Sequence, residues 1–138
     1  MELRILAVGK LKQAGLETLV ADYCKRSRSL LPITLEPLRD AAALRNRLDR
    51  PRVLLDQRGE QITTEALAGW LSHWRDRGIR RVDFAIGDAH GFTDQDRASA
   101  DRILALSRLT LPHRLAQVLL VEQLYRAGTI LAGHPYHH

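Results

Sequence analysis

The chain has little cysteine and no long apolar run, and both absences exclude classes of protein. Cys24 is its one cysteine among 138 residues, so no disulfide forms within the chain, which favours a reducing compartment. No stretch approaches the roughly 20 apolar residues of a membrane-spanning helix. The first ten residues hold an apolar run without a small-residue cleavage site, which indicates a strand and not a signal peptide. We therefore expect a cytoplasmic protein with no membrane partner.

The overall composition is that of a globular protein. Hydrophobic residues make up 45% of the chain and charged residues 27%, which excludes a disordered chain. The length predicts one domain over residues 1–138. A chain of this size buries about two thirds of its unfolded surface, so it folds without disulfides or a structural metal.

Lysine is scarce, and the basic residues are mostly arginine. The chain has 21 Lys and Arg against 16 Asp and Glu, a net charge of +5, and the arginines gather at residues 26–28, 45–52 and 75–81. Guanidinium groups bind phosphate oxygens in a bidentate manner, so the charge favours a nucleic-acid partner. The alternative is the arginine usage of a high-GC genome, which would leave an ordinary solvated surface.

Apolar runs and amphipathic periodicity alternate about five times along the chain. They predict strands at residues 3–8, 33–35, 53–55, 82–86 and 109–111, and a polar turn at 57–60. They predict helices at residues 15–29, 40–49, 64–77, 94–106 and 113–132, with Thr63 or Thr64 and Thr93 as N-caps. This alternation predicts an α/β fold, an open and mostly parallel sheet with helices on both faces. Pro37 limits the second strand, because a proline inside a sheet suits an edge strand or the end of a strand.

At three places a predicted strand ends in a polar or glycine-containing loop. These loops are Leu55–Gln57, Ile86–Gly91 and Leu106–Leu111. Ligands of open parallel sheets bind beyond the carboxyl ends of the strands, so the three loops would line one crevice if they emerge at one edge. The alternative is that they are ordinary turns. The chain has neither a G-x-G-x-x-G fingerprint nor a P-loop lysine motif.

The other reactive side chains carry weaker signals. Cys24 lies on the apolar face of a predicted helix, which favours a packed thiol over a nucleophile. The six histidines do not form a recognisable metal set, so we expect no metal site. His113 either caps a helix or faces the crevice. Glu122 and Arg126 form an i,i+4 ion pair, or Arg126 reaches a phosphate.

The C-terminal third carries specific motifs. Leu109–His113 reads LTLPH, Val121–Ala127 reads VEQLYRA and His134–His137 reads HPYH. With Leu3–Lys12 and Phe84–Gly87, these motifs resemble the small SPOUT-class methyltransferases, specifically the ribosomal large-subunit family that methylates N3 of a pseudouridine in 23S rRNA. The resemblance spans nearly the whole chain. One departure is Asp88, where the family usually has a second glycine; Asp tolerates a positive φ better than most residues.

The resemblance implies S-adenosylmethionine as methyl donor, a homodimer, and a C-terminal trefoil knot that holds the donor. It also implies 23S rRNA, within the ribosome or the large subunit, as the partner. Matching the family motifs assigns the donor contacts to Leu55, Gly87, Leu106, Ser107, Arg108, Leu109, Thr110 and Leu111.

The matched tail suggests three catalytic residues. His137 would assist removal of the N3 proton or orient the nucleotide base, Tyr136 would stack on that base, and Arg126 would anchor a neighbouring phosphate. A rival interpretation is a non-catalytic, basic RNA-binding module, whose RNA binding is indifferent to S-adenosylmethionine. A flavodoxin-like nucleotide binder is a third, although its first loop would need more glycine and hydroxyl residues.

Overall fold

The computed structural model describes residues 1–137, and these form five strands and five helices. In chain order they are β1 (Glu2–Val8), α1 (Ala14–Ser27), β2 (Ile33–Leu38), α2 (Ala41–Arg47), β3 (Arg52–Glu60), α3 (Thr64–Asp76), β4 (Arg81–Ile86), α4 (Asp94–Ser99), β5 (Arg102–Leu104) and α5 (His113–Leu131). The strands build one sheet in the order β2-β1-β4-β3-β5, and every pair is parallel. The predicted parallel sheet is confirmed.

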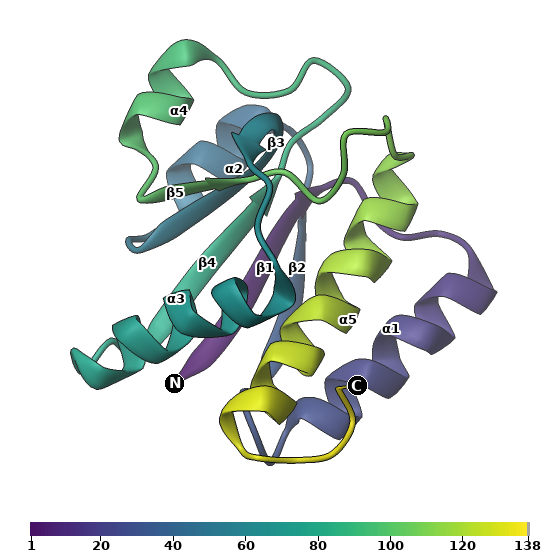
Figure 1. Cartoon of the computed structure of the whole chain (residues 1–138). Coiled ribbons are helices and arrows are strands. Elements are labelled where there is room, and N and C mark those ends of the chain that lie inside the picture. Colours follow the sequence, from purple (N-terminus) through teal and green to yellow (C-terminus); the bar gives the residue numbers. More distant parts are fainter. Residues whose placement is uncertain (138) are drawn as a thin grey trace.

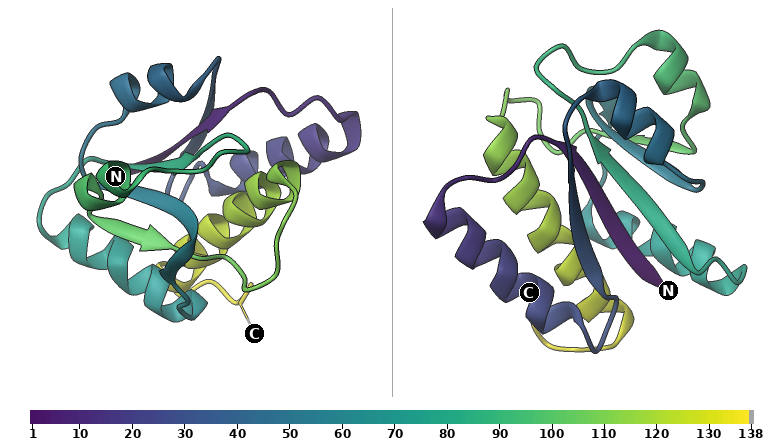
Figure 2. Two further views of the ribbon diagram at one scale, coloured as in Figure 1. Left: turned by 90° about the horizontal axis from the view of Figure 1, so that it is seen from above. Right: turned by 180° about the vertical axis from the view of Figure 1, so that it is seen from behind.

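Helices cover both faces of the sheet, as predicted (Figures 1 and 2). Alternate strand residues such as Ile5 and Phe84 point into the larger core, which α1, α3 and α5 cover. Leu6 and Ala85 point the other way, into a smaller core with Leu44 of α2. Burial on both faces explains why the central strands read as continuous apolar runs.

Local signals located several boundaries correctly. The Thr63 hydroxyl accepts a hydrogen bond from the Ala66 amide at 3.1 Å, so Thr63 and not Thr64 caps α3. Thr93 and Asp96 form a reciprocal capping box at the start of α4. β2 lies at one edge of the sheet, and its Pro37 pairs with Ala7 of β1. An edge strand tolerates a proline, which has no backbone N–H to donate.

The predicted helix over residues 94–106 is wrong in its second half. α4 ends at Ser99, and Ile103 and Leu104 belong to strand β5. Ile103 pairs with Leu54 of β3, and the Asp101 amide donates to the Arg52 carbonyl at 2.9 Å. A short apolar run fits a helix or a buried strand equally well, and pairing with a distant strand decided between them.

The predicted strand over residues 109–111 is also wrong, because this segment is a loop. Leu109 is 75% exposed, and its amide donates to the Ser107 hydroxyl at 2.9 Å. A β-branched and leucine-rich triplet favours a strand only when a neighbouring strand pairs with it, and β5 already occupies that edge of the sheet.

Gly59 lies inside a strand and not in the predicted polar turn. β3 continues to Glu60, which lies opposite Leu104 across a register shift. A Cβ atom on Gly59 would stand 2.6 Å from the backbone carbonyl carbon of Ile103. Only glycine lets the two backbones approach so closely.

Candidate functional site

A cavity opens at the carboxyl edge of the sheet. It has a volume of about 730 Å³, within the usual range of small-molecule sites. The ends of β1, β3, β4 and β5 and the first turns of α5 enclose it with mostly apolar side chains. Its lining includes Val8, Leu55, Asp56, Gln57, Ile86, Gly87, Asp88, Ala89, His90, Gly91, Phe92, Leu104, Leu106, Ser107, Leu109, Thr110, Leu111, His113 and Ala116. The three segments singled out in the sequence therefore share one cavity, although Leu55–Gln57 lies within β3 and is not the loop that the sequence predicted.

Seven of the eight residues assigned to the donor line this cavity. They are Leu55, Gly87, Leu106, Ser107, Leu109, Thr110 and Leu111. The Gln57 side-chain amide donates to the Thr110 hydroxyl at 3.1 Å and so joins the first loop to the third. Arg108 is the exception, because its Nε atom donates to Gln61 Oε1 at 3.0 Å and the residue is not part of the lining.

Phe92 is a lining residue that the sequence did not reveal. A Cβ atom on Gly87 would lie 3.3 Å from the Phe92 ring, so Gly87 makes room for that ring. The ring in turn forms part of the cavity wall. The available signal was a lone aromatic residue between Gly91 and the Thr93 cap, a position where apolar residues commonly pack against the helix start.

Asp88 fits its turn without strain. Among residues 1–137, positive φ angles occur only at glycines, so Asp88 does not need the left-handed conformation. Its carboxylate accepts the His90 amide at 2.9 Å, and its carbonyl accepts the Gly91 amide at 3.0 Å. Asp88, which replaces the second glycine of the family pattern, thus stabilises a turn beside the cavity through these two hydrogen bonds.

His113 both begins α5, directly after the N-cap Pro112, and lines the cavity, so the two alternatives that the sequence left open are true together. The Gln117 amide nitrogen lies 3.2 Å from Nδ1 of His113, and Gln117 itself is 2% exposed. Because an amide nitrogen donates, Nδ1 accepts this hydrogen bond, which places the ring proton on Nε2. That Nε2 atom is buried and has no partner within residues 1–137. His113 is therefore a cavity-lining residue with a buried N–H that lacks an acceptor.

The three predicted catalytic residues form a second cluster. Arg126 pairs with Glu122 at 2.6 Å, and its guanidinium carbon lies 4.8 Å from the centre of the Tyr136 ring. His137 is held from both sides, since its Nε2 lies 2.6 Å from Glu65 Oε1 and its Nδ1 lies 3.3 Å from Arg126 Nη1.

The charges of this cluster are mutually stabilised. The hydrogen bond from His137 lowers the pKa of Glu65. Burial, with help from the Tyr23 hydroxyl and the Glu122 charge, raises the pKa of Tyr136 to about 12, so the phenol stays protonated. Since Arg126 already has Glu122 as a partner, its charge is largely neutralised in this arrangement.

The tail cluster does not reach the cavity within one chain. His113 begins α5 at the cavity, and Arg126 follows it by about 20 Å along the helix axis. None of Arg126, Tyr136 and His137 lines the cavity. In Figure 1 the C-terminal end of α5 and the tail lie at the opposite end of the molecule from the loop that precedes α5.

Cys24, the other reactive side chain, has a structural role. Cys24 is half-buried against the larger core, and burial raises the pKa of its thiol, so the expected packed role is confirmed. Within residues 1–137, no three His, Cys, Asp or Glu side chains are grouped to hold a metal ion. No helix of this part of the chain is long and apolar enough to cross a membrane. A broader hollow of about 1070 Å³ lies at the opposite, amino-terminal edge of the sheet, away from all strand carboxyl ends.

Comparisons with known proteins agree with this architecture. Residues 1–137 match the family described as "Predicted SPOUT methyltransferase". The chain is 43% identical to the ribosomal RNA large subunit methyltransferase H of Koribacter versatilis, over 99% of this chain and 98% of that protein. It is 44% identical to the protein of the same name from Geobacter metallireducens, over 100% and 99%, and 43% identical to that of Erythrobacter litoralis, over 99% and 98%. The chain therefore belongs to the SPOUT methyltransferase family.

Proposed function

We propose that this chain is an S-adenosylmethionine-dependent methyltransferase that methylates N3 of a pseudouridine in 23S rRNA, in the cytoplasm of a bacterium. The observation that carries the proposal is the single cavity at the carboxyl edge of a parallel sheet, lined by seven of the residues that match the family's donor motifs. The names of its relatives and the excess of arginine support ribosomal RNA as the substrate.

The cavity suits the proposed donor in size and chemistry. Apolar side chains such as Leu55, Leu106 and Leu111 complement an adenine ring, and the buried Nε2–H of His113 is a donor without a protein acceptor. When bound, S-adenosylmethionine supplies a methyl group on a positively charged sulfur. The residues that would hold it are Leu55, Gly87 and the loop 106–111.

The main contribution of the protein is to position the reactants. The chemistry would be a direct displacement: the N3 nitrogen of the base would attack the methyl carbon while the bond from that carbon to sulfur breaks, S-adenosylhomocysteine would leave, and the N3 proton would pass to a base. Holding two reactants in line is worth about 7–11 kcal/mol of the barrier. The rigid sheet edge and the Gln57–Thr110 hydrogen bond fix the cavity for this purpose.

We infer a homodimer in which the tail of one copy completes the cavity of the other. The tail motifs and the cavity stand apart in one chain, so a second copy is needed if both act on one nucleotide. α5 and α1 also carry exposed leucines, namely Leu115 (45%), Leu119 (42%) and Leu19 (40%). Burial of these side chains against a second copy supplies a driving force for association.

His137 is the proposed base, and its contacts define what it must do. Nε2 carries the proton that it donates to Glu65, and the lone pair of Nδ1 faces Arg126, so the ring must exchange Arg126 for the substrate before Nδ1 accepts a proton. A base of this kind contributes about 10²–10⁴-fold to the rate. If His137→Ala kept full turnover and a normal pH profile, His137 would be dropped as the base.

Two measurements test the proposal and separate it from a non-catalytic RNA-binding module. Calorimetry should show that the purified protein binds S-adenosylmethionine, whereas the module would bind RNA without any effect of that donor. Mass mapping of 23S rRNA from cells that lack the protein should show one methyl group missing from a pseudouridine, and complementation should restore it. An unchanged modification pattern would refute the proposal.

A further inference from the structure

α3 runs beside the β5 edge of the sheet (Figure 2), and side chains from both enclose a third hollow. We name it the α3 groove; its volume is about 430 Å³, and its lining consists of Gly69, Trp70, His73, Trp74, Asp101 and Arg102. It contains both tryptophans of the chain, and each is half-buried. None of these residues belongs to the cavity at the carboxyl edge or to the tail cluster.

Arg102 is held in place as a stacking surface. Its guanidinium carbon lies over the Trp70 ring, 4.8 Å from the ring centre, and its Nη1 donates to Glu60 Oε1 at 3.1 Å. The Arg102 side chain remains 44% exposed, so much of the guanidinium is free for another partner. Unpaired bases of RNA stack on aromatic rings and on guanidinium planes.

Gly69 keeps the groove open at a cost to the helix. Glycine in a helix interior is unfavourable relative to alanine, because it loses more conformational freedom on folding. A Cβ atom on Gly69 would meet no atom within 4 Å, so packing does not require a glycine there. The missing side chain has one visible effect, which is to leave space beside His73 and Trp74 in the groove.

The charges around the groove favour an anionic polymer. The one carboxylate in its lining, Asp101, is occupied by Arg50 Nη2 at 2.6 Å and by the Arg52 amide at 2.8 Å. Arg75 in the last turn of α3 and its C-cap residue Arg77 lie outside the lining and have no carboxylate within 4.0 Å in the described part of the chain. A base stacked on Trp70 or Arg102 would leave its phosphates to such arginines beyond the groove.

We propose that the α3 groove binds an unpaired base of the RNA substrate, at a site separate from the reacting nucleotide. Arg102 at the start of β5 lines the groove and Leu104 at its end lines the cavity, so about 10 Å of strand or less separates the two sites. The proposal rests on the proposed function in one respect, that the substrate is RNA. The groove then sets which RNA segment is presented to the cavity.

The sharpest test is Gly69→Leu, which fills the groove and favours the helix. The thermal unfolding midpoint should stay equal to that of the wild type or rise, and the calorimetric affinity for S-adenosylmethionine should not change. The KM for large ribosomal subunits should rise roughly tenfold or more, the size expected for one stacked base, while kcat is kept. A purely structural role for Gly69 predicts an unchanged KM, and a KM within about twofold of the wild type would overturn the proposal.

Matched substitutions test the stacking itself. Arg102→Gln should raise the KM, whereas Arg39→Gln, which removes the same charge from an exposed side chain on the other face, should not. Binding of a short single-stranded RNA should quench tryptophan fluorescence, and Trp70→Leu should weaken that binding while Trp70→Phe retains it. Absence of quenching, or equal effects of Arg102→Gln and Arg39→Gln, would refute a base-stacking site. Donor binding and methyl transfer are measured apart from these readouts, so failure of the groove and failure of the proposed function are distinguishable.

Discussion

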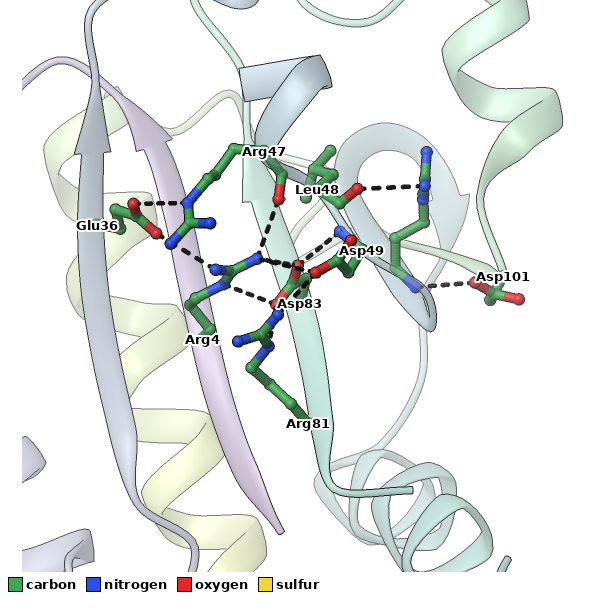
Figure 3. A network of polar contacts seen from close by, with 9 residues as sticks. Arg4, Glu36, Arg47, Leu48, Asp49, Arg81, Asp83 and Asp101 are labelled. Carbon is green, nitrogen blue, oxygen red and sulfur yellow. Dashed lines mark hydrogen bonds and ion pairs between the residues drawn. The ribbon is translucent and has the colours of Figure 1, made fainter. Parts of the chain in front are cut away.

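Arg4 and Asp83 form a buried, bidentate ion pair across the centre of the sheet (Figure 3). They lie directly opposite each other on β1 and β4, with Nε–Oδ1 at 2.9 Å and Nη2–Oδ2 at 2.6 Å, and they are 5% and 1% exposed. Arg4 also donates to the Arg47 carbonyl at 3.0 Å, and Asp83 accepts the Asp49 amide at 2.8 Å. The pair thus fastens the segment after α2 to the strands.

Replacing one partner of this pair should destabilise the protein strongly. Asp83→Asn removes the bidentate anion of Arg4 and leaves the buried guanidinium with only the more distant carboxylates of Glu36, at 3.5 Å, and Asp49, at 4.0 Å. We expect the free energy of unfolding to fall by about 3–5 kcal/mol, as measured by urea denaturation. Arg39→Gln is the control, because that ion pair with Asp40 is solvent-exposed and should be worth less than about 1 kcal/mol. A loss of stability below about 1 kcal/mol for Asp83→Asn would contradict a structural role for the Arg4–Asp83 pair.

The unpaired Nε2–H of His113 should contribute to the binding of S-adenosylmethionine and not to folding. His113→Phe keeps a ring of similar size at the cavity wall but removes Nε2–H. We expect the affinity for S-adenosylmethionine to fall by roughly tenfold, the size of one lost hydrogen bond to a polar group. Calorimetry measures the affinity, and an unchanged unfolding midpoint is the control. Equal affinities would show that His113 does not contact the donor.

Acid should remove one defined contribution to stability. The hydrogen bonds from Arg45, at 2.8 and 2.9 Å, lower the pKa of Asp96 from 3.8 to about 2. A carboxyl whose pKa is lower in the folded state stabilises that state when the pH is above its pKa in the unfolded chain. This contribution is therefore present above about pH 4 and is lost as the pH falls towards 2. In Arg45→Gln the pKa of Asp96 should rise, and stability should depend less on pH in that window. NMR titration of the Asp96 carboxyl checks this, and an unshifted pKa would contradict it.

If the tail of one copy completes the cavity of the other, two inactive variants should complement each other. Gly87→Leu obstructs the cavity near Phe92, and His137→Ala removes the proposed base. Each homodimer should transfer methyl groups at a few per cent of the wild-type rate or less. Heterodimers isolated with two affinity tags should recover up to about half of it, because one of their two sites is intact. Heterodimers that stay inactive would contradict a shared site.

Features that depend on neighbours in sequence were predictable. The Thr93 cap and the Glu122–Arg126 ion pair follow from spacing alone, because their partners lie three or four residues away. Features that depend on distant segments were not. The sequence predicts Ile103 and Leu104 as the end of a helix, but they pair with β3 as strand β5. It predicts Gly59 in a turn, but Gly59 lies in β3 against the backbone of β5.

The candidate site divides in the same way. Loops at the carboxyl ends of parallel strands necessarily share an edge, so Leu55, Gly87 and Leu111 were foreseeable as neighbours. Side-chain direction was not foreseeable. The sequence alone therefore did not show that Arg108 binds Gln61 or that His113 lines the cavity. The trefoil knot implied by the family resemblance stays a prediction.

The amino-acid sequence by itself determined the alternation of strands and helices, because hydrophobic periodicity and capping act over a few residues. Its motifs also determined the family. Only the tertiary structure decided that the tail residues stand apart from the cavity, that α3 carries a groove beside β5, and that Arg4 meets Asp83. Each of these depends on contacts between segments tens of residues apart, whose geometry the packing of the whole chain sets.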